Sequence, residues 1–240
     1  DHQAATNARI ESLVDKGEEL SLEISSLTAA VEACQARRHL LEEMMVHYEG
    51  YESGTVAVLE KKQEWPGFDG TVAERFVPVE GMEAALEAAL GEVSKYVICR
   101  DRHSAEAIVA YLREQKKGRI GIVVPDSGSF TPAVKRPELN RDNVVGWLDA
   151  FVSTDDTLRP LMEAVLARTL VFRAGSSPDE ILEKLPYGFR AVSTDGILYS
   201  KNVITGGSDD SFPLFRRKEK ILEQESQIAQ LSSRLDAFRE

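Results

Sequence analysis

Cysteine is scarce in this chain: Cys34 and Cys99 are the only two among 240 residues. Two cysteines that lie in separate apolar patterns cannot build the disulfide framework of a small secreted domain. Each is placed like a small buried hydrophobic residue, as is usual for a protein of a reducing compartment. We therefore expect free thiols and a cytoplasmic protein.

Long apolar runs and export signals are also missing. No stretch of about eighteen apolar residues occurs, so no segment is expected to span a membrane. The first residues lack the basic-then-apolar pattern of a signal peptide. The chain begins without Met and inside a heptad pattern, so we expect a fragment of a longer protein.

Motifs of nucleotide and metal chemistry are absent as well. Neither Gly-x-x-x-x-Gly-Lys-Ser/Thr nor Gly-x-Gly-x-x-Gly occurs, which excludes phosphate-binding and dinucleotide-binding loops of those types. The four histidines show no metal-ligand spacing with one another or with the cysteines. We expect no cofactor, no metal and no catalytic residues in this segment.

Positive charge is in the minority. The formal net charge is -11, and residues 1–50 hold four Lys/Arg against ten Asp/Glu. Residues 213–240 hold six against five. No half of the chain is basic by composition, so any contact with nucleic acid must be local.

The chain does have a long heptad pattern at each end. Apolar residues recur at alternating steps of three and four through residues 1–49 and again through 213–240, which is typical of a left-handed coiled coil. The a and d positions of the first arm are Ile10, Leu13, Gly17, Leu20, Ile24, Leu27, Val31, Cys34, Arg38, Leu41, Met45 and Tyr48. Those of the second arm are Leu214, Arg217, Ile221, Gln224, Ile228, Leu231, Leu235 and Phe238.

The two arms are expected to pair with each other, antiparallel. The second arm from Leu214 gives about 40 Å of helix. Counted back from Tyr48, this length covers the first arm only to about residue 22. We therefore expect the first twenty or so residues to lack a partner helix within this chain. The alternative is two amphipathic helices that pack separately on the domain.

The middle of the chain repeats itself loosely. Gly70 and Gly146 begin similar segments, and Glu87-Ala-Ala-Leu is matched by Glu163-Ala-Val-Leu at the same offset. Each copy alternates strands with helices, which predicts mixed or parallel sheets covered by helices. We predict an α/β (α+β) domain at 50–212, flanked by an antiparallel intramolecular coiled coil. Its two related subdomains are expected at 50–125 and 144–212, with a linker at 126–143.

Several local features are predicted inside the copies. Thr55–Leu59 is expected to be a short strand or turn. Ser104 and Ser177 are plausible helix N-caps. The segment from Asp195 to Gly207 has a hairpin pattern that ends in a double glycine.

Glycines mark candidate strand edges. Gly70, Gly206 and Gly207 each end an apolar stretch, and the last two follow Val203 and Ile204 on the expected last strand. A last strand is often an edge, and an open edge invites pairing with another chain. Plain turn chemistry is the competing explanation for each glycine alone.

Basic residues cluster at the arm roots. Arg216, Arg217 and Lys218 begin the second arm, where a helix N-terminus disfavours cations. Lys61 and Lys62 follow the first arm. Two explanations of the root cluster stay open. One is contact with phosphate groups, and the other is pairing with acidic residues of the first arm. A further group, Arg113–Arg119, ends a helix, where cations are favourable for structural reasons alone.

Several runs of the middle resemble the hinge domain of structural maintenance of chromosomes (SMC) proteins of the prokaryotic type. The runs are Gly70-Thr-Val-Ala-Glu, Ala84–Gly91, Tyr96-Val-Ile-Cys, Val192-Ser-Thr-Asp-Gly and Val203-Ile-Thr-Gly-Gly-Ser. The resemblance covers residues 48–220, and the flanking arms fit it.

The resemblance implies a hinge that dimerises as a two-fold ring, with Gly70, Val203, Ile204, Gly206 and Gly207 at the contacts. It also implies an ATPase head outside this segment, kleisin and accessory subunits of the full-length complex, and association with the nucleoid. Weak DNA binding near the arm roots is a further expectation, at the five basic residues named above for the roots: Lys61, Lys62, Arg216, Arg217 and Lys218.

Two rival functions stay open on the residues alone. One is a nucleic-acid-binding module whose dimerisation is incidental, which salt-dependent affinity would reveal. The other is a small α/β enzyme inserted in a coiled-coil scaffold, which needs a pocket with perturbed acid or base groups.

Overall fold

The chain forms two compact units in the computed structural model, which describes residues 2–125, 134–137, 143–207 and 214–238. One unit comprises residues 1–46 and 217–240, and the other comprises 47–216. The subdomain and linker boundaries inside the second unit stay predictions, and most of the expected linker lies outside the described residues.

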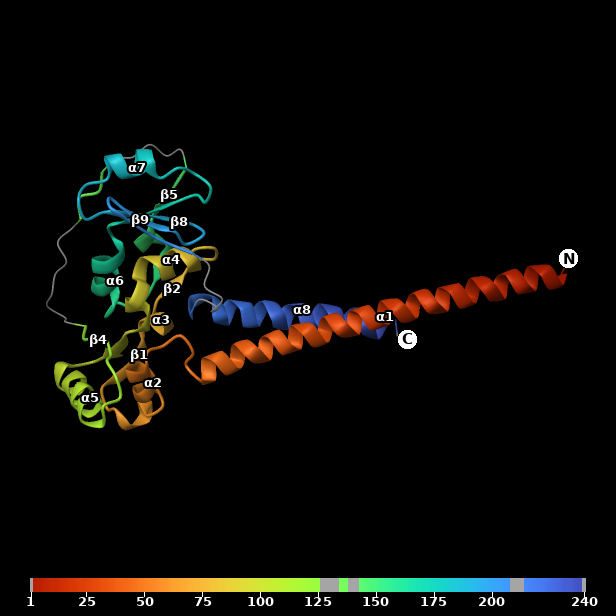
Figure 1. Ribbon diagram of the computed structural model, residues 1–240, viewed down its shortest axis with the longest axis horizontal. Coiled ribbons are helices and arrows are strands. Elements are labelled where there is room, and N and C mark those ends of the chain that lie inside the picture. Colours follow the sequence, from red (N-terminus) through yellow and green to blue (C-terminus); the bar gives the residue numbers. More distant parts are fainter. Residues whose placement is uncertain (1, 126–133, 138–142, 208–213, 239–240) are drawn as a thin grey trace. The chain divides into compact units, whose positions relative to one another are not determined.

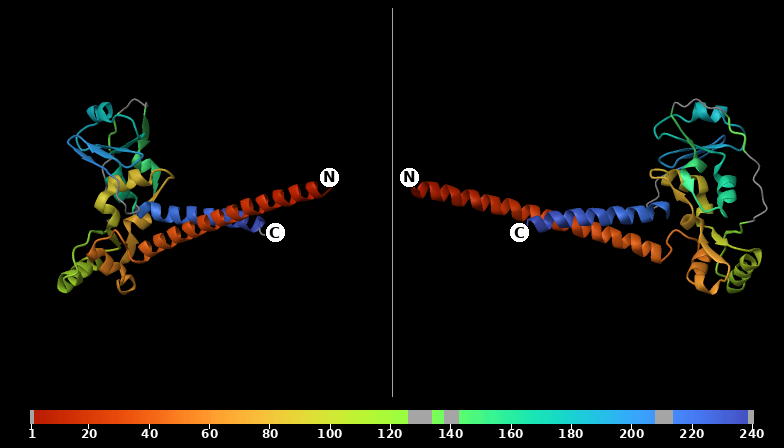
Figure 2. Two further views of the ribbon diagram at one scale, coloured as in Figure 1. Left: turned by 45° about the vertical axis from the view of Figure 1, so that its right-hand side comes forward. Right: turned by 180° about the vertical axis from the view of Figure 1, so that it is seen from behind.

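The first unit consists of two helices, α1 (His2–Val46) and α8 (Arg217–Ala237). Glu23 on α1 lies 3.7 Å from Arg234, and Cys34 Sγ lies 3.7 Å from Gln227 Oε1. The numbers rise along α1 while they fall along α8, so the helices are antiparallel, and they lie side by side in both figures (Figures 1 and 2). The predicted pairing of the two arms is confirmed.

Burial in this unit follows the predicted heptad frame except at the end of α1, where Met44 is buried and the seam residue Met45 is only partly buried. Leu27, Leu41 and Leu235, all at seam positions, are buried. Ile10 and Leu13 lie before the paired stretch and are 54% and 61% exposed. This agrees with the length argument, because α8 reaches only the later part of α1.

The second unit begins with the first copy of the repeat, shown from orange to green in Figure 1. Its elements are α2 (Ser53–Leu59), the 3-10 helix η1 (Lys62–Glu64), β1 (Phe68–Thr71), α3 (Val72–Arg75), β2 (Val77–Pro78), α4 (Glu83–Leu90), the 3-10 helix η2 (Gly91–Lys95), β3 (Val97–Cys99), α5 (Arg102–Gln115) and β4 (Ile122–Val123).

The second copy follows the order of the first from β1 to β4, without a counterpart of η2, and adds two strands. Its elements are β5 (Val144–Trp147), the 3-10 helix η3 (Leu148–Phe151), β6 (Val152–Ser153), α6 (Arg159–Leu166), β7 (Thr169–Phe172), α7 (Asp179–Lys184), β8 (Arg190–Ser193), β9 (Leu198–Ser200) and β10 (Val203–Thr205). The 3-10 helix η4 (Leu214–Arg216) closes the unit.

Sheet topology supports the repeat. The first copy has strand order β1-β3-β4, in which the first pair is antiparallel and the second parallel. The second copy has order β10-β9-β8-β7-β5, and β5-β7-β8 repeats the same directions. The short strands β2 and β6 pair with each other, and Val77 lies opposite Ser153. The equivalent strands β2 and β6 therefore pair with each other, as expected for two copies related by a local two-fold axis.

The two copies share one core. Ile98 of β3, Val171 of β7 and Val192 of β8 are fully buried in the same cluster as Leu90 and Leu166 of α4 and α6. The alternate strand residues point to the outer faces, where separate clusters pack under α5 and under α7. This alternation is the two-residue period of a strand covered on both faces.

Some local predictions were wrong. Thr55–Leu59 is helical, because Ala57, Val58 and Leu59 pack as one turn against the α5 side of the domain rather than pairing in a sheet. The N-cap of α5 is Asp101, whose carboxylate accepts a hydrogen bond from the Ser104 backbone N–H at 2.8 Å. Pro178, not Ser177, occupies the cap position of α7.

Candidate functional site: two open sheet edges

Strand β10 is the outer strand of the five-stranded sheet. Val203 and Ile204 on this strand are 58% and 70% exposed, although both are large apolar residues. Gly206 and Gly207 follow and are also exposed. The prediction that the last strand lies at an edge is confirmed, and its role in a dimer stays a prediction.

The β9–β10 hairpin is held firmly on its inner side. Val203 pairs with Ser200 across a two-residue loop, and the Ser200 hydroxyl donates to the Val203 carbonyl at 3.2 Å. Strand β9 pairs with β8, and the Tyr199 ring lies 5.7 Å from the Phe172 ring. Among the described residues, β10 therefore pairs with β9 on one side and with no strand on the other.

The second edge is β4 in the first copy. Within the described residues β4 pairs with β3 alone, through Ile122 opposite Val97 and Val123 opposite Ile98. Its counterpart β8 has β9 as a second, antiparallel neighbour. The first copy thus lacks, in the described chain, the strand that completes the sheet of the second copy.

A groove runs beside β4. It has a volume of about 850 Å³, and its lining includes Val109 and Arg113 of α5 together with Ile120, Ile122 and Val124. Val109 is 50% exposed. The lining is mixed, because Arg102, Glu106 and Glu114 also border the groove. A groove next to a strand edge, with apolar residues along the strand, suits an added strand, since the backbone supplies hydrogen bonds and the groove accepts alternate side chains.

Gly70 has a local explanation in the structure. It lies at an irregularity in the β1–β3 pairing with a φ of 97°. Gly146 occupies the corresponding irregularity of β5 and also has a positive φ, of 155°. A bulge with positive φ favours glycine, so this feature explains Gly70 without a partner chain. Its place at a dimer contact stays a prediction.

Residues near the beginning and the end of the second unit both contact the first copy. The Tyr51 hydroxyl lies 3.4 Å from the Thr71 hydroxyl at the start of α3. The Leu214 backbone N–H donates to Glu87 Oε1 of α4 at 3.1 Å. Phe215 is buried in the shared core. Both arm roots are thus attached to the first copy.

The predicted DNA-binding residues are not equally available. Lys62 and Lys218 are exposed and Arg216 is partly buried. Lys61 Nζ lies 3.1 Å from Glu64 Oε2, and this hydrogen bond raises the pKa of Lys61. Arg217 is only 3% exposed, which makes it the least accessible of the five. The DNA-binding role of all five residues stays a prediction.

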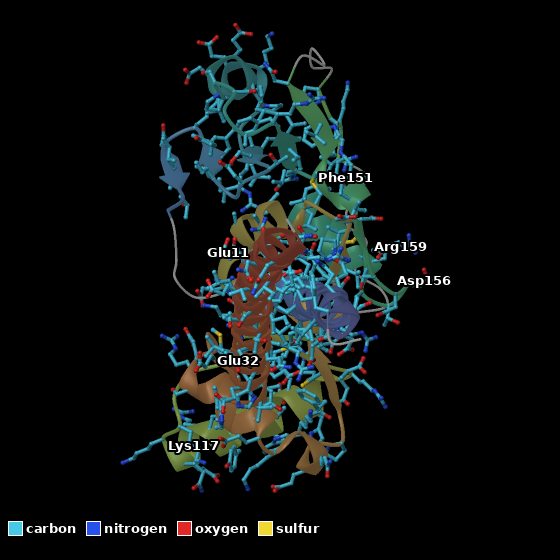
Figure 3. The ribbon with its side chains drawn as sticks, turned by 90° about the vertical axis from the view of Figure 1, so that its right-hand side faces the viewer. Glu11, Glu32, Lys117, Phe151, Asp156 and Arg159 are labelled. Atoms are coloured by element: carbon cyan, nitrogen blue, oxygen red, sulfur yellow. The ribbon has the colours of Figure 1, made fainter. Side chains whose placement is uncertain are left out.

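The structure draws attention to another basic group. Arg113, Lys116, Lys117 and Arg119 at the end of α5 are all exposed, and Lys117 projects away from the ribbon (Figure 3). No ion pair joins these four to an acidic residue of the described chain. The sequence interpretation assigned them to the stabilisation of the helix end. Their spacing gave no sign that they would form an exposed group.

The described residues lack several features of other protein classes. None of their helices is long and apolar enough to cross a membrane. Their His, Cys, Asp and Glu side chains form no group of three that could hold a metal ion. Both cysteines are free.

Comparison with known proteins gives consistent results. Residues 65–174 match the family model of the SMC proteins flexible hinge domain. The chromosome partition protein Smc of Halothermothrix orenii is 30% identical over 201 residues, which are 82% of this chain and 17% of that protein. The Smc protein of Bacillus subtilis is 22% identical over 213 residues, 88% of this chain and 18% of that protein. The chain thus spans under a fifth of each relative's length.

Solved structures show the same fold. The Geobacillus stearothermophilus SMC hinge domain, described as an asymmetric dimer, superimposes with a TM-score of 0.69 at 22% identity and covers 92% of this chain and 91% of its own. The Pyrococcus furiosus Smc hinge domain with an extended coiled coil gives a TM-score of 0.54 at 21% identity, over 97% of this chain and 86% of its own.

Proposed function

We propose, from the premise that the middle of this chain is an SMC hinge domain, that it joins two copies of a chromosome-partitioning protein at the tip of their coiled coils and transforms no substrate. The observation that carries this proposal is the exposure of Val203 and Ile204 on an ordered edge strand. Exposed apolar edges of this kind are otherwise avoided because they cause aggregation.

The contact we propose pairs β10 of one copy with β4 of its partner. Strand β9 provides the precedent for a strand added beside β4, since it runs antiparallel beside β8, the counterpart of β4. Val203 and Ile204 would supply alternate side chains, and the groove with Val109 and Ile122 would receive them. A two-fold axis makes two identical contacts. The second contact then closes at high effective concentration, which raises the overall affinity.

The remaining functions belong to the longer protein and are proposals too. We infer an ATPase head, kleisin and accessory subunits, and a cytoplasmic, nucleoid-associated location from the Smc relatives. The hinge itself then needs no cofactor, and its partner is a second copy of this chain.

The first test is the mass in solution. Ile204→Glu places a charge on the edge strand, and we expect the dimer to give way to a monomer by light scattering at micromolar concentration. Leu222→Glu is the matched control, because Leu222 on α8 is 65% exposed and Ile204 is 70% exposed. An Ile204→Glu variant that stays dimeric would remove β10 from the interface.

A second test uses complementary charges. Ile204→Glu and Val109→Lys chains should each be monomeric alone, because each change damages both contacts of a homodimer. A mixture should form a heterodimer, with one contact unaltered and one Glu–Lys contact. Failure of the mixture to dimerise would mean that β10 and the α5 groove do not meet.

Weak DNA binding is the second candidate function. The four exposed cations at the end of α5 favour it, since they form a local positive group on a chain of net charge -11. We expect Lys116→Ala with Lys117→Ala to weaken binding of a short duplex and to reduce its salt dependence by about two phosphate contacts. Fluorescence anisotropy at two salt concentrations measures both. Lys16→Ala with Arg9→Ala on α1 is the control, and an equal effect there would mean that binding is not local.

A further inference from the structure

Arg38 and Gln224, two of the three polar residues that the heptad frame places in the coiled-coil seams with Arg217, belong to the same layer of the coil. We propose that this layer sets the register in which the two arms pair. The inference concerns the arms alone and does not depend on how the hinge dimerises.

One short contact fixes the axial register of α1 relative to α8. Cys34 Sγ reaches Gln227 Oε1 at 3.7 Å, and a cysteine side chain is too short to reach far along the helix axis. Gln227 adjoins the seam residue Ile228, so Cys34 and Ile228 share a layer. Moving along both heptads from there gives the remaining layers. They are Ile24–Phe238, Leu27–Leu235, Val31–Leu231, Arg38–Gln224, Leu41–Ile221 and Met45–Arg217.

Burial agrees with this register. Leu27 and Leu235, which share a layer, are 7% and 8% exposed. Leu20 is the next seam residue before Ile24 and lies beyond the layer of Phe238. It is 45% exposed. A register shifted by one heptad would place Leu20 against Leu235 and bury it.

Gln224 of the polar layer is connected to α1 indirectly, through Gln227 and Cys34 beside the neighbouring layer. Gln224 is 6% exposed, and its Nε2 donates to Gln227 Oε1 at 3.3 Å. The same oxygen also accepts a hydrogen bond from the Cys34 thiol of α1. Arg38 Nε is shielded from solvent and lies 3.4 Å from Glu42 Oε1, one turn further along α1. Arg38 therefore has a counter-charge on its own helix and a polar residue opposite.

Other registers remove these matches. A slip of one heptad in one direction sets Arg38 against Arg217 and Gln224 against Val31. A slip in the other direction sets Arg38 against Leu231 and Gln224 against Met45. Both slips oppose like charges or bury a polar group against an apolar one, which is costly. Met45–Arg217 sets a polar residue against an apolar one in the native register too, so this layer gives that register no advantage. Most other layers pair apolar residues, which exchange partners at little cost. The Arg38–Gln224 layer is thus the one whose match is lost in either slip.

Disulfide trapping tests the proposal in the whole chain. Cys34 is the natural reporter, and Cys99 is fully buried with its pKa raised to about 11 by burial, so it reacts slowly. Ile228→Cys, Ile221→Cys and Leu235→Cys each place a second thiol opposite Cys34 in the native or a slipped register. Mild oxidation at low protein concentration, followed by mass analysis of intrachain bonds, measures the rates.

In the natural background we expect Ile228→Cys to react at least about tenfold faster than the other two variants. In the Arg38→Leu, Gln224→Leu background this preference should fall to within about threefold. Val31→Leu, which changes an apolar layer, should keep the tenfold preference. Equal rates at all three positions in the natural background would overturn the register. A preserved preference in the double variant would overturn the role of the polar layer. Circular dichroism confirms that each variant is helical.

Discussion

The two copies of the hinge share one arrangement of strands and helices but differ at the edge of the sheet. Each has an antiparallel strand pair, a parallel βαβ unit and a helix that faces a shared core. The second copy then adds the β9–β10 hairpin and covers its own β8. Among the described residues the first copy has no such strand beside β4. An open edge in one copy and an extra edge strand in the other are complementary.

Under the proposed function, this difference is what lets a repeat produce an assembly surface. Two identical copies would have identical strand edges, so the edge of one copy would not be specifically complementary to the edge of the other. One additional hairpin makes the two edges unlike each other, so each edge of a protomer can accept the other edge of a partner. The following predictions test how alike the copies are within the protomer.

The largest effect is expected in the shared core. Leu90 and Leu166 end α4 and α6 at equivalent positions and are 4% and 0% exposed. Leu90→Ala and Leu166→Ala should each lower the free energy of unfolding by about 2–5 kcal/mol. Urea denaturation should show one transition for the hinge in both variants. Separate transitions would mean that the copies have independent cores. Val79→Ala at an exposed position is the control.

A smaller effect is expected where the copies differ in helix capping. Thr71 accepts a hydrogen bond from the Glu74 N–H at 3.3 Å, and Glu74 Oε2 accepts from the Thr71 N–H at 2.9 Å, which completes a capping box on α3. The equivalent position before η3 is Trp147, which has no such side-chain bond. Thr71→Ala should cost about 1 kcal/mol. Thr71→Ser keeps the hydroxyl and should cost only a few tenths. Equal losses would mean that packing of the methyl group, not the cap, matters.

The smallest effect concerns an ion pair that joins the copies. Arg75 Nη2 of α3 lies 2.7 Å from Asp155 Oδ2 before α6. This hydrogen bond lowers the pKa of Asp155 below 3.8 and raises the pKa of Arg75. Because the folded pKa of Asp155 is the lower one, the pair stabilises the fold above pH 3.8 and loses this contribution as the pH falls through the folded value.

The pair is partly exposed, so its contribution should stay below about 1 kcal/mol. Urea midpoints between pH 5 and pH 2.5 measure it. The Asp155→Asn variant should be less stable near pH 5 and should lose less stability on acidification than the unaltered chain. The same slope in both would show that other carboxylates cause the loss.

Regular patterns in the sequence predicted much of the molecule. The heptad seams gave the antiparallel arms and their unequal length, because a coiled coil needs only local periodicity. The offset between Gly70 and Gly146 gave the repeat. The apolar run before Gly206 predicted the last strand, which lies at an edge of the five-stranded sheet.

Features that depend on distant residues were not predicted. Thr55–Leu59 is as apolar as a strand, and only the α5 surface against which it packs makes it a helix. Arg217 had two readings in the sequence, as a seam residue and as a root cation, and the structure shows it buried. The edge at β4 and its groove arise from a strand order that no local pattern contains.

The sequence alone determined where the arms, the copies and the strands lie, because these follow from periods of two, three and four residues and from glycine. The tertiary structure decided which strand edges stay open and which polar residues face each other, because both depend on residues far apart in the chain that folding brings together.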